Sequence, residues 1–207
     1  MSYKTEQEEF WAGDFGDQYI GRNDSDELLA SNLSFFSRAL QSICKAGSVM
    51  EFGANIGMNL KALKLLFPGQ LQYAVEINKT ACQQLEAVIG SGNVTHGSIF
   101  DVDTARQVEL SMIKGVLIHI NPDMLPDVYR KLYEVSTRYI LIAEYYSPAQ
   151  VEISYRGHVG KLFKRDFCGD ILDQYPDLRL LDYGFVYRRD PAFPQDDITW
   201  FLLEKGV

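Results

Sequence analysis

A ten-residue stretch near the start of the chain most constrains its fold. Residues 48–57 read Ser-Val-Met-Glu-Phe-Gly-Ala-Asn-Ile-Gly, so a short apolar run ends in Glu51 and meets a turn with two glycines. Residues 59–67 then have the apolar spacing of a helix. A strand, a tight turn and a helix N-terminus form the junction at which open α/β sheets bind ligands. The carboxylate at the strand end restricts which ligand such a turn accepts.

Length and composition indicate one globular, soluble domain. The 207 residues suffice for a single full core, and 46% hydrophobic with 23% charged residues is typical of globular proteins. No apolar run approaches the length of a membrane span, and the acidic N-terminus is unlike a signal peptide, so we expect no membrane partner. The scattered Cys44, Cys82 and Cys168 lack metal-ligand spacing, which predicts no metal and a cytoplasmic location.

Strands and helices alternate through the middle of the chain. We expect strands at 49–52, 71–77, 93–97, 113–120 and 139–145, and helices at 59–67, 80–89, 103–111 and 122–135. This rhythm predicts a doubly wound α/β sheet that is mostly parallel. The last two predicted strands, 180–188 and 198–204, have no helical segment between them, so we expect them to pair antiparallel.

The chain divides into four segments of one domain, 1–207. Residues 1–45 are predicted to form an aromatic arm, 1–24, and a helix, 25–45, that Asp24 or Ser25 caps. Residues 46–145 are the predicted ligand-binding core. Residues 146–178 are the predicted substrate-side segment, and 179–207 hold the C-terminal strands.

The first turn does not match the dinucleotide template G-x-G-x-x-G. The three glycine positions of the template fall on Gly53, Asn55 and Met58, and only the first matches. The second glycine normally lets the backbone approach a pyrophosphate, which Asn55 would obstruct. Glu51 would also place a negative charge beside negative phosphates. A nicotinamide or flavin dinucleotide is therefore disfavoured.

A ligand with a cationic amine and no phosphate reverses this argument, and S-adenosylmethionine is such a ligand. Glu51 then becomes an attractive partner, directly or through water. Glu76, with Ile77 beside it, follows Glu51 by 25 residues, about where an acid at the second strand end binds ribose hydroxyls. We expect Ser98 to hydrogen-bond adenine and Ile99 to pack on its face. The alternatives are a glycine turn that only packs strand against helix and a solvated Glu76.

These residues together resemble the ordered motifs of class I S-adenosylmethionine-dependent methyltransferases. The motifs are Glu51-x-Gly53-x-Asn55-x-Gly57, Glu76, Ser98-Ile99 and the segment 115–120, and the resemblance covers roughly residues 45–145 and the C-terminal strands. It implies a Rossmann-like, seven-stranded sheet with an antiparallel final strand, and S-adenosylmethionine as cofactor. Asn55 replaces the commoner glycine, but asparagine tolerates left-handed backbone conformations.

A narrower resemblance concerns the arm. Residues 8–23, 115–122 and 161–167 look like segments of methyltransferases associated with pseudaminic acid (nonulosonic sugar) biosynthesis. This resemblance implies methyl transfer to the oxygen or nitrogen of a small sugar-type metabolite. The basic residues between 156 and 165 favour an anionic acceptor, and we expect a monomer or homodimer. Two alternatives stay open: a methyltransferase for an unrelated small metabolite, and a non-catalytic cofactor-binding partner protein. The net charge of −8 argues against nucleic-acid binding, which needs a basic face.

His119 is the candidate catalytic residue. It lies near the end of a predicted apolar strand, and strand ends line the active sites of such sheets. A hydroxyl or ammonium acceptor must lose a proton, and histidine suits that role near neutral pH. The alternative is a core histidine that hydrogen-bonds the backbone.

The candidate acceptor-binding residues gather after the fifth predicted strand and in the arm. They are Trp11, Tyr145, Tyr155, Arg156, His158, Lys161 and Arg165. If the segment is helical, Lys161 and Arg165 share a face and can bind an anion; the alternative is a solvated helix face. Tyr19 and Arg22 are assigned to the cofactor side of a lid that they form with Trp11. The alternative is an arm that only packs on the sheet or across a dimer.

Overall fold

The computed structural model describes residues 3–22, 24–43 and 45–206. In this part of the chain, seven strands form one sheet in the order β3-β2-β1-β4-β5-β9-β8. The strands are β1 (Ser48–Phe52), β2 (Leu71–Glu76), β3 (Val94–His96), β4 (Val108–Lys114), β5 (Ser136–Glu144), β8 (Leu178–Val186) and β9 (Ile198–Lys205). Strand β9 runs antiparallel to β5 and β8, and the first five strands pair in parallel. The expected sheet is thus confirmed.

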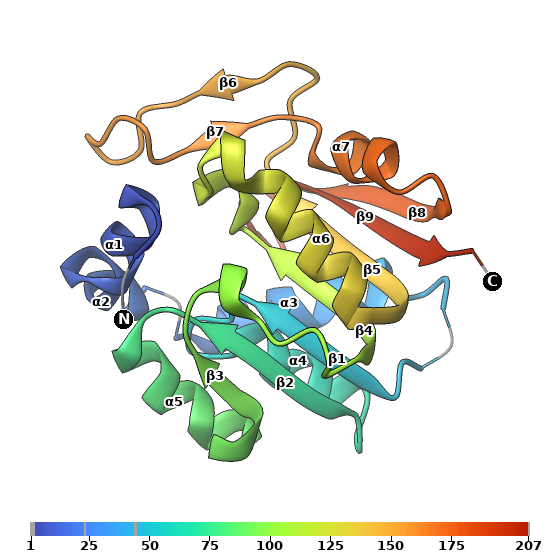
Figure 1. Cartoon of the computed structure of the whole chain (residues 1–207). Coiled ribbons are helices and arrows are strands. Elements are labelled where there is room, and N and C mark those ends of the chain that lie inside the picture. The colour runs from blue at the N-terminus through green and yellow to red at the C-terminus, as the bar shows by residue number, and fades with distance from the viewer. Residues whose placement is uncertain (1–2, 23, 44, 207) are drawn as a thin grey trace.

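Helices cover both faces of the sheet (Figure 1). They are α3 (Asp26–Ala39), α4 (Met58–Leu66) and α5 (Lys79–Ile89) on one face, and α6 (Leu125–Val135) and α7 (Phe167–Gln174) on the other. Side chains alternate along β1, so Val49 is buried in the core beneath α3 and α4, whereas Met50 is buried beneath α6. The result is the three-layer arrangement expected of a doubly wound fold.

Two expectations around the fourth strand were wrong. The predicted helix 103–111 and strand 113–120 are replaced by β4 at Val108–Lys114 and a short 3-10 helix at Leu117–His119. Gly115, in a left-handed conformation at φ +68°, ends the strand earlier than its apolar continuation indicates. The backbone N–H groups of Val116 and Leu117 then bind the Glu144 carboxylate instead of a neighbouring strand.

The remaining boundaries differ by smaller amounts. Helix α3 ends at Ala39 rather than continuing to residue 45, and Ser25 Oγ caps it by accepting a hydrogen bond from Leu28 N at 3.1 Å. Residue Cys44 lies outside the described residues, as do 1–2, 23 and 207. No described helix is long and apolar enough to cross a bilayer.

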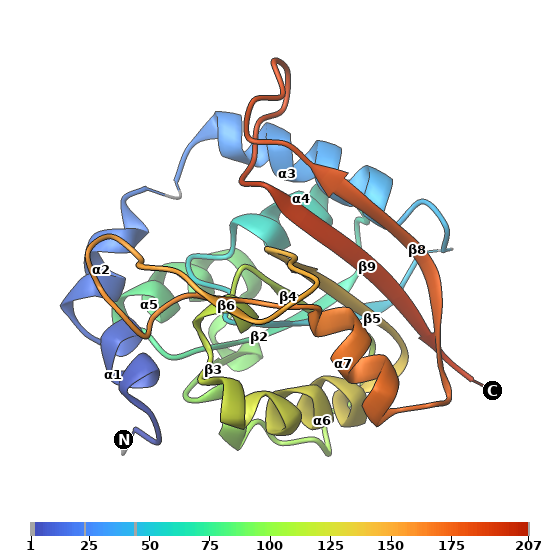
Figure 2. The same cartoon turned by 90° about the horizontal axis from the view of Figure 1, so that it is seen from above.

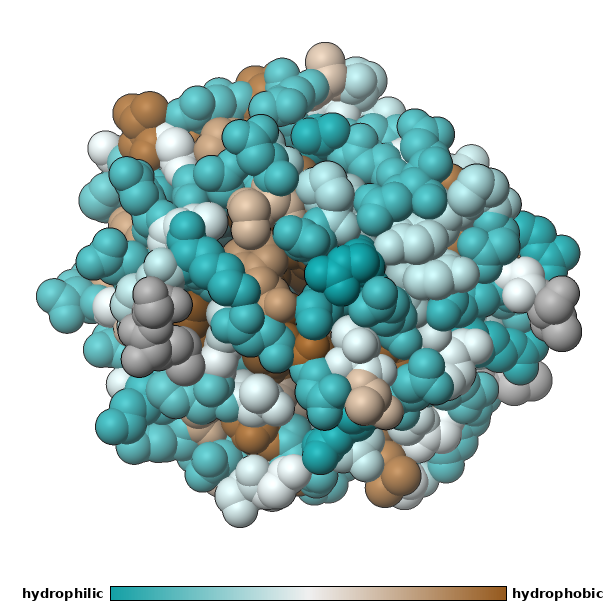
Figure 3. Space-filling view, in the orientation of Figure 1, coloured by the Kyte–Doolittle hydropathy of each residue, from teal (hydrophilic) through white to brown (hydrophobic). Residues whose placement is uncertain are grey.

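The arm and the substrate-side segment lie together at the carboxyl ends of the parallel strands (Figures 1 and 2). The arm consists of α1 (Glu6–Ala12) and α2 (Asp14–Ile20), and the segment forms a small hairpin of β6 (Val151–Glu152) and β7 (Phe163–Lys164). Gln7 Nε2 donates to the Gly160 carbonyl at 2.9 Å, which joins the two. The face shown in Figure 3 is largely hydrophilic, with apolar side chains in a hollow near its middle.

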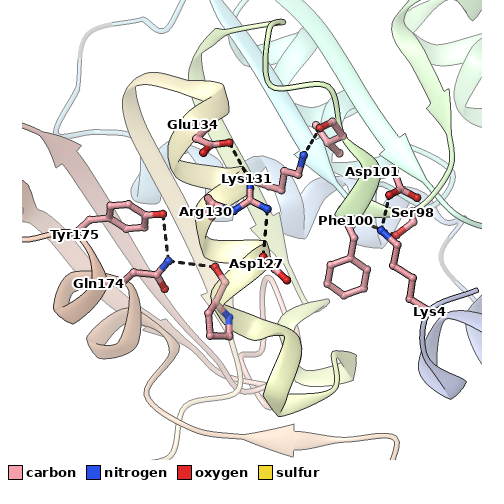
Figure 4. A network of polar contacts seen from close by, with 12 residues as sticks. Lys4, Ser98, Phe100, Asp101, Asp127, Arg130, Lys131, Glu134, Gln174 and Tyr175 are labelled. Carbon is pink, nitrogen blue, oxygen red and sulfur yellow. Dashed lines mark hydrogen bonds and ion pairs between the residues drawn. The ribbon is translucent and has the colours of Figure 1, made fainter.

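Polar contacts also tie the arm to the sheet. Lys4 Nζ pairs with the Asp101 carboxylate in the turn after β3, close to Ser98 (Figure 4). Asn78 Nδ2 donates to Asp17 Oδ1 at 3.0 Å at the start of α5. The arm therefore spans the ends of β2 and β3, where the candidate site lies.

Candidate functional site

A cavity of about 260 Å³ opens at the carboxyl ends of β1, β2 and β4. Eight of the predicted site residues line it: Trp11, Tyr19, Gly53, Asn55, Glu76, Ile77, Ile99 and His119. The arm, α3 and the loop before β9 complete its wall. The cavity therefore brings together residues from both ends of the chain.

The glycine turn brings the backbone close to its neighbours. Gly53 and Gly57 have φ angles of +74° and +83°, which L-residues other than glycine rarely adopt. A Cβ on Gly53 would lie 2.7 Å from Val116 Cγ2, and one on Gly57 2.7 Å from Leu85 Cδ1. Asn55 takes the left-handed conformation as well, at φ +49°, in line with its expected tolerance. Gly57 does not line the cavity itself but starts α4.

The Glu76 carboxylate is held by backbone N–H groups. Glu76 Oε2 accepts from Asn55 N and Oε1 from Asn78 N, both at 2.7 Å. Burial raises the pKa of Glu76, and these hydrogen bonds partly offset the shift. Each oxygen keeps a lone pair, so the carboxylate can still accept from a ligand hydroxyl in the cavity.

Glu51 lies behind the cavity wall. It is 1% exposed, and Asn59 Nδ2, whose residue lines the cavity, donates to Glu51 Oε1 at 2.6 Å. Glu51 Oε2 has no hydrogen-bond partner among the described residues. Burial raises the pKa of Glu51 to about 8, although Asn59 and Lys114 favour the ionised form. An unpartnered buried oxygen of this kind is costly unless a donor reaches it.

The expected adenine side of the site is only partly in the cavity. Ile77 and Ile99 line it, whereas Ser98 does not. Ser98 Oγ accepts a hydrogen bond from Phe100 N at 3.1 Å and so caps the 3-10 helix Ile99–Asp101. Its hydroxyl can still donate, because this contact uses a lone pair.

His119 lies in the 3-10 helix after β4 and lines the cavity. Its Nδ1 lies 2.6 Å from the Lys161 carbonyl oxygen, so Nδ1 carries the proton and donates. Burial lowers the pKa of His119 to about 4, which keeps the ring neutral at pH 7. Nε2 therefore bears the lone pair and can accept a hydrogen bond or a proton from a ligand.

Aromatic side chains of the arm surround His119. The Trp11 ring centroid lies 4.6 Å from that of His119 and 5.2 Å from that of Tyr19. Tyr155 lies 4.9 Å from His119 by the same measure, beyond the cavity lining. The arm is thus part of the cavity wall and not only a surface cover.

The basic residues expected to bind an anion lie outside the cavity lining, and residues 161–165 are not helical. Arg165 follows β7 and pairs with Asp170, with 2.6 Å between Nε and Oδ2. Lys161 Nζ lies 3.6 Å from Glu6 Oε2. Arg156 is exposed beside Tyr155, and the exposed His158 contacts the ring of Phe10. The exposed Arg22 also lies away from the cavity.

Sequence reasoning missed a polar cluster on the far side of the cavity. Lys114, at the end of β4, lies 3.5 Å from Asn32 Oδ1, which also accepts from Gln195 Nε2 at 3.0 Å. Burial lowers the pKa of Lys114, although Glu51, Asp196 and Glu144 favour its charged form. Tyr145 lies outside the lining and hydrogen-bonds Asp196, which lines the cavity. Because the fourth strand was predicted at 113–120, Lys114 was expected near its start; β4 in fact ends at Lys114.

No group of three or more histidine, cysteine or acidic residues in the described ranges has the geometry to hold a metal ion.

No protein-family model and no curated protein matches the sequence. Solved structures do match. The 1,6-didemethyltoxoflavin-N1-methyltransferase of Burkholderia thailandensis is 15% identical with a TM-score of 0.74, over 100% of this chain and 92% of that one. The chain has the Rossmann-like methyltransferase fold.

Other structures with this fold lead to the same conclusion. The magnesium protoporphyrin IX methyltransferase of Synechocystis PCC 6803 is 12% identical, with a TM-score of 0.68 over 100% of both chains. The mitomycin 7-O-methyltransferase is 14% identical with a TM-score of 0.68, and 98% of this chain covers 61% of that one. At these identities the likeness concerns the fold.

Proposed function

We propose that this protein binds S-adenosylmethionine and transfers its methyl group to the oxygen or nitrogen of a small sugar-type metabolite. The observation that carries the proposal is the pair of buried carboxylates, Glu51 and Glu76, at the ends of adjacent strands around one glycine turn. The Burkholderia thailandensis neighbour was solved with S-adenosylhomocysteine and the Synechocystis one with S-adenosylmethionine, which supports the cofactor assignment.

The residues present fit this cofactor. Glu51 Oε2 and Asn55 Oδ1 have no hydrogen-bond partners among the described residues. An ammonium group, directly or through water, and ligand hydroxyls would satisfy them. The remaining lone pairs of Glu76 suit the ribose, and Ile77 and Ile99 provide an apolar surface for adenine. When bound, S-adenosylmethionine supplies a methyl group on a good leaving group, so the protein's task is mainly positioning.

The chain's own residues account for the rest of the task. Because Nδ1 of neutral His119 is held by the Lys161 carbonyl, Nε2 is the ring atom that would accept the acceptor's proton. Trp11 and the arm form part of the cavity wall and would limit the access of water to the reacting groups. Glu144 holds the turn that carries Val116 and His119.

The resemblance of the arm to pseudaminic acid-associated methylases supports a sugar-type acceptor. The residues that line the cavity do not support the expected negative charge of the acceptor. Of the described lining residues, Lys114 is the one lysine or arginine, against the acids Glu8, Glu76 and Asp196. The lining therefore favours a different charge for the acceptor.

Incubation with methyl-labelled S-adenosylmethionine and a panel of sugar metabolites tests the proposal. Label transfer to a sugar oxygen or nitrogen supports it. Cofactor binding without transfer to any acceptor would favour the non-catalytic alternative. Transfer only to non-sugar metabolites would contradict the sugar assignment and retain the methyltransferase activity.

A further inference from the structure

Helix α1 turns two polar side chains toward the cavity. Glu8 and Trp11 are three residues apart, so they share one face of the helix, and both line the cavity. Glu8 is 6% exposed. Its Oε2 accepts from the backbone N–H of Lys4, whereas Oε1 has no hydrogen-bond partner among the described residues. Trp11 Nε1 is likewise buried and has no hydrogen-bond partner among the residues that the structure describes.

No described lysine, arginine or histidine forms an ion pair with Glu8. Two lysines, one before α1 and one in the substrate-side segment, form contacts with other residues. The Lys4 ammonium pairs with Asp101, and the Lys161 ammonium lies beside Glu6 and 5.5 Å from the centre of the Phe10 ring. A buried carboxylate without a cation is costly, and a cationic ligand would offset that cost.

The surroundings of Trp11 favour the same kind of ligand. The rings of Trp11, His119 and Tyr155 lie within 6.4 Å of one another, measured between centroids. Aromatic faces attract cations through their quadrupoles, and His119 Nε2 adds a hydrogen-bond acceptor. A carboxylate, an indole ring and a neutral imidazole acceptor together suit a protonated nitrogen and oppose an anion.

We propose that Glu8, Trp11 and His119 form the acceptor subsite, and that the acceptor presents a basic nitrogen there instead of a carboxylate. This inference rests on the proposed function, because Glu51 and Glu76 are assigned to the cofactor. Asp196, the other acid of the lining, hydrogen-bonds Tyr145, which leaves Glu8 for the acceptor. Trp11 Nε1–H donates to an oxygen of the same ligand. The amine-bearing class includes amino sugars and excludes acidic sugars without an amine.

Calorimetry on the full chain saturated with S-adenosylhomocysteine tests this with two probes, glucosamine and glucuronate. We expect glucosamine to bind at least about tenfold more tightly. Glu8→Gln keeps the shape of the side chain but removes its charge, and should weaken glucosamine binding about tenfold or more. Glu9→Gln is the matched control, because Glu9 is exposed on the same helix, and it should change neither affinity. Trp11→Phe should weaken glucosamine binding less than Glu8→Gln.

The affinity for S-adenosylhomocysteine separates two kinds of failure. If it does not bind the wild-type protein, the proposed function fails and this inference with it. If it binds but glucuronate binds as tightly as glucosamine, or glucosamine does not bind, only the acceptor assignment is overturned. If Glu8→Gln weakens S-adenosylhomocysteine more than glucosamine, Glu8 belongs to the cofactor site and the assignment is also overturned.

Discussion

Glu76 Oε2 accepts a hydrogen bond from the backbone N–H of Asn55, with 2.7 Å between the two atoms. This contact connects the end of β2 to the left-handed residue of the glycine turn after β1. Because Oε1 is held by Asn78 N as well, the carboxylate has one orientation. The residue assigned to the ribose therefore also sets the shape of the turn that receives the rest of the cofactor.

Replacement of Glu76 by Ala should weaken S-adenosylhomocysteine binding at least about tenfold, because it removes charge-assisted hydrogen bonds and frees the turn. Calorimetry measures the effect. Glu86→Ala, an exposed change on α5, is the control and should leave the affinity unchanged. An unaltered affinity in folded Glu76→Ala protein would refute the ribose assignment.

Gly53→Ala should destabilise the protein by about 2–4 kcal/mol, which combines a left-handed backbone with overpacking against Val116. Gly69→Ala is the control, because Gly69 has φ +87° and a Cβ added there would meet nothing within 4 Å. This change should lower the free energy of unfolding only through the left-handed backbone, by about 1–2 kcal/mol. Urea denaturation measures both free energies of unfolding. Equal losses would show that the close approach to Val116 does not matter.

The affinity for S-adenosylhomocysteine should rise with pH between about 6 and 7.5, by up to about tenfold per pH unit. Burial raises the pKa of Glu51 to about 8, so the side chain is mostly protonated in this range without ligand. A bound ammonium stabilises the ionised form, and binding then releases a proton. Because this pKa is higher in the folded than in the unfolded protein, Glu51 contributes fully to the free energy of unfolding below its unfolded pKa. That contribution is lost as pH rises through about 8.

Glu51→Gln is the control for this pH dependence. It keeps an oxygen acceptor for Asn59 and removes the titration, so the slope should become shallower. Calorimetry at the two pH values in buffers of different ionisation enthalpy counts the protons released. An affinity that falls with rising pH would contradict the role of Glu51 as partner of an ammonium group.

Glu144→Ala should destabilise the protein by about 2–4 kcal/mol, because the N–H groups of Val116 and Leu117 lose their acceptor at 2.9 Å. Both N–H groups bind the same oxygen, Oε1, so Glu144→Gln can keep both hydrogen bonds and should lose less. Urea denaturation distinguishes the two variants. Equal losses would show that the negative charge, not the acceptor oxygen, holds the turn.

The first turn was predictable because its signals are local. Two glycines in a turn, the carboxylate of Glu51 near the end of a strand and the distance to Glu76 are all readable within about thirty residues, and both glycines have positive φ in the structure. Gly53, Asn55 and Glu76 line the same cavity. The charge of Glu51 was not predictable. Burial raises its pKa, so repulsion of a phosphate is a weaker argument than the sequence indicated.

The end of β4 and the contacts of the basic residues after β5 depend on residues elsewhere in the chain. Residues 113–120 are mostly apolar, which suits a strand as well as a 3-10 helix. The Glu144 carboxylate from β5 binds the backbone after Gly115 and so favours the 3-10 helix. Arg165 looked free to bind an anion, but β7 places it against Asp170. Periodicity carries no information about such partners.

Calorimetric titration of the wild-type protein with S-adenosylhomocysteine, and separately with NADH, tests the central claim most directly. The arrangement of Glu51, Asn55 and Glu76 predicts a micromolar dissociation constant for S-adenosylhomocysteine, on the order of −8 kcal/mol, and weaker binding of NADH. Tighter binding of NADH, or no binding of S-adenosylhomocysteine, would contradict it.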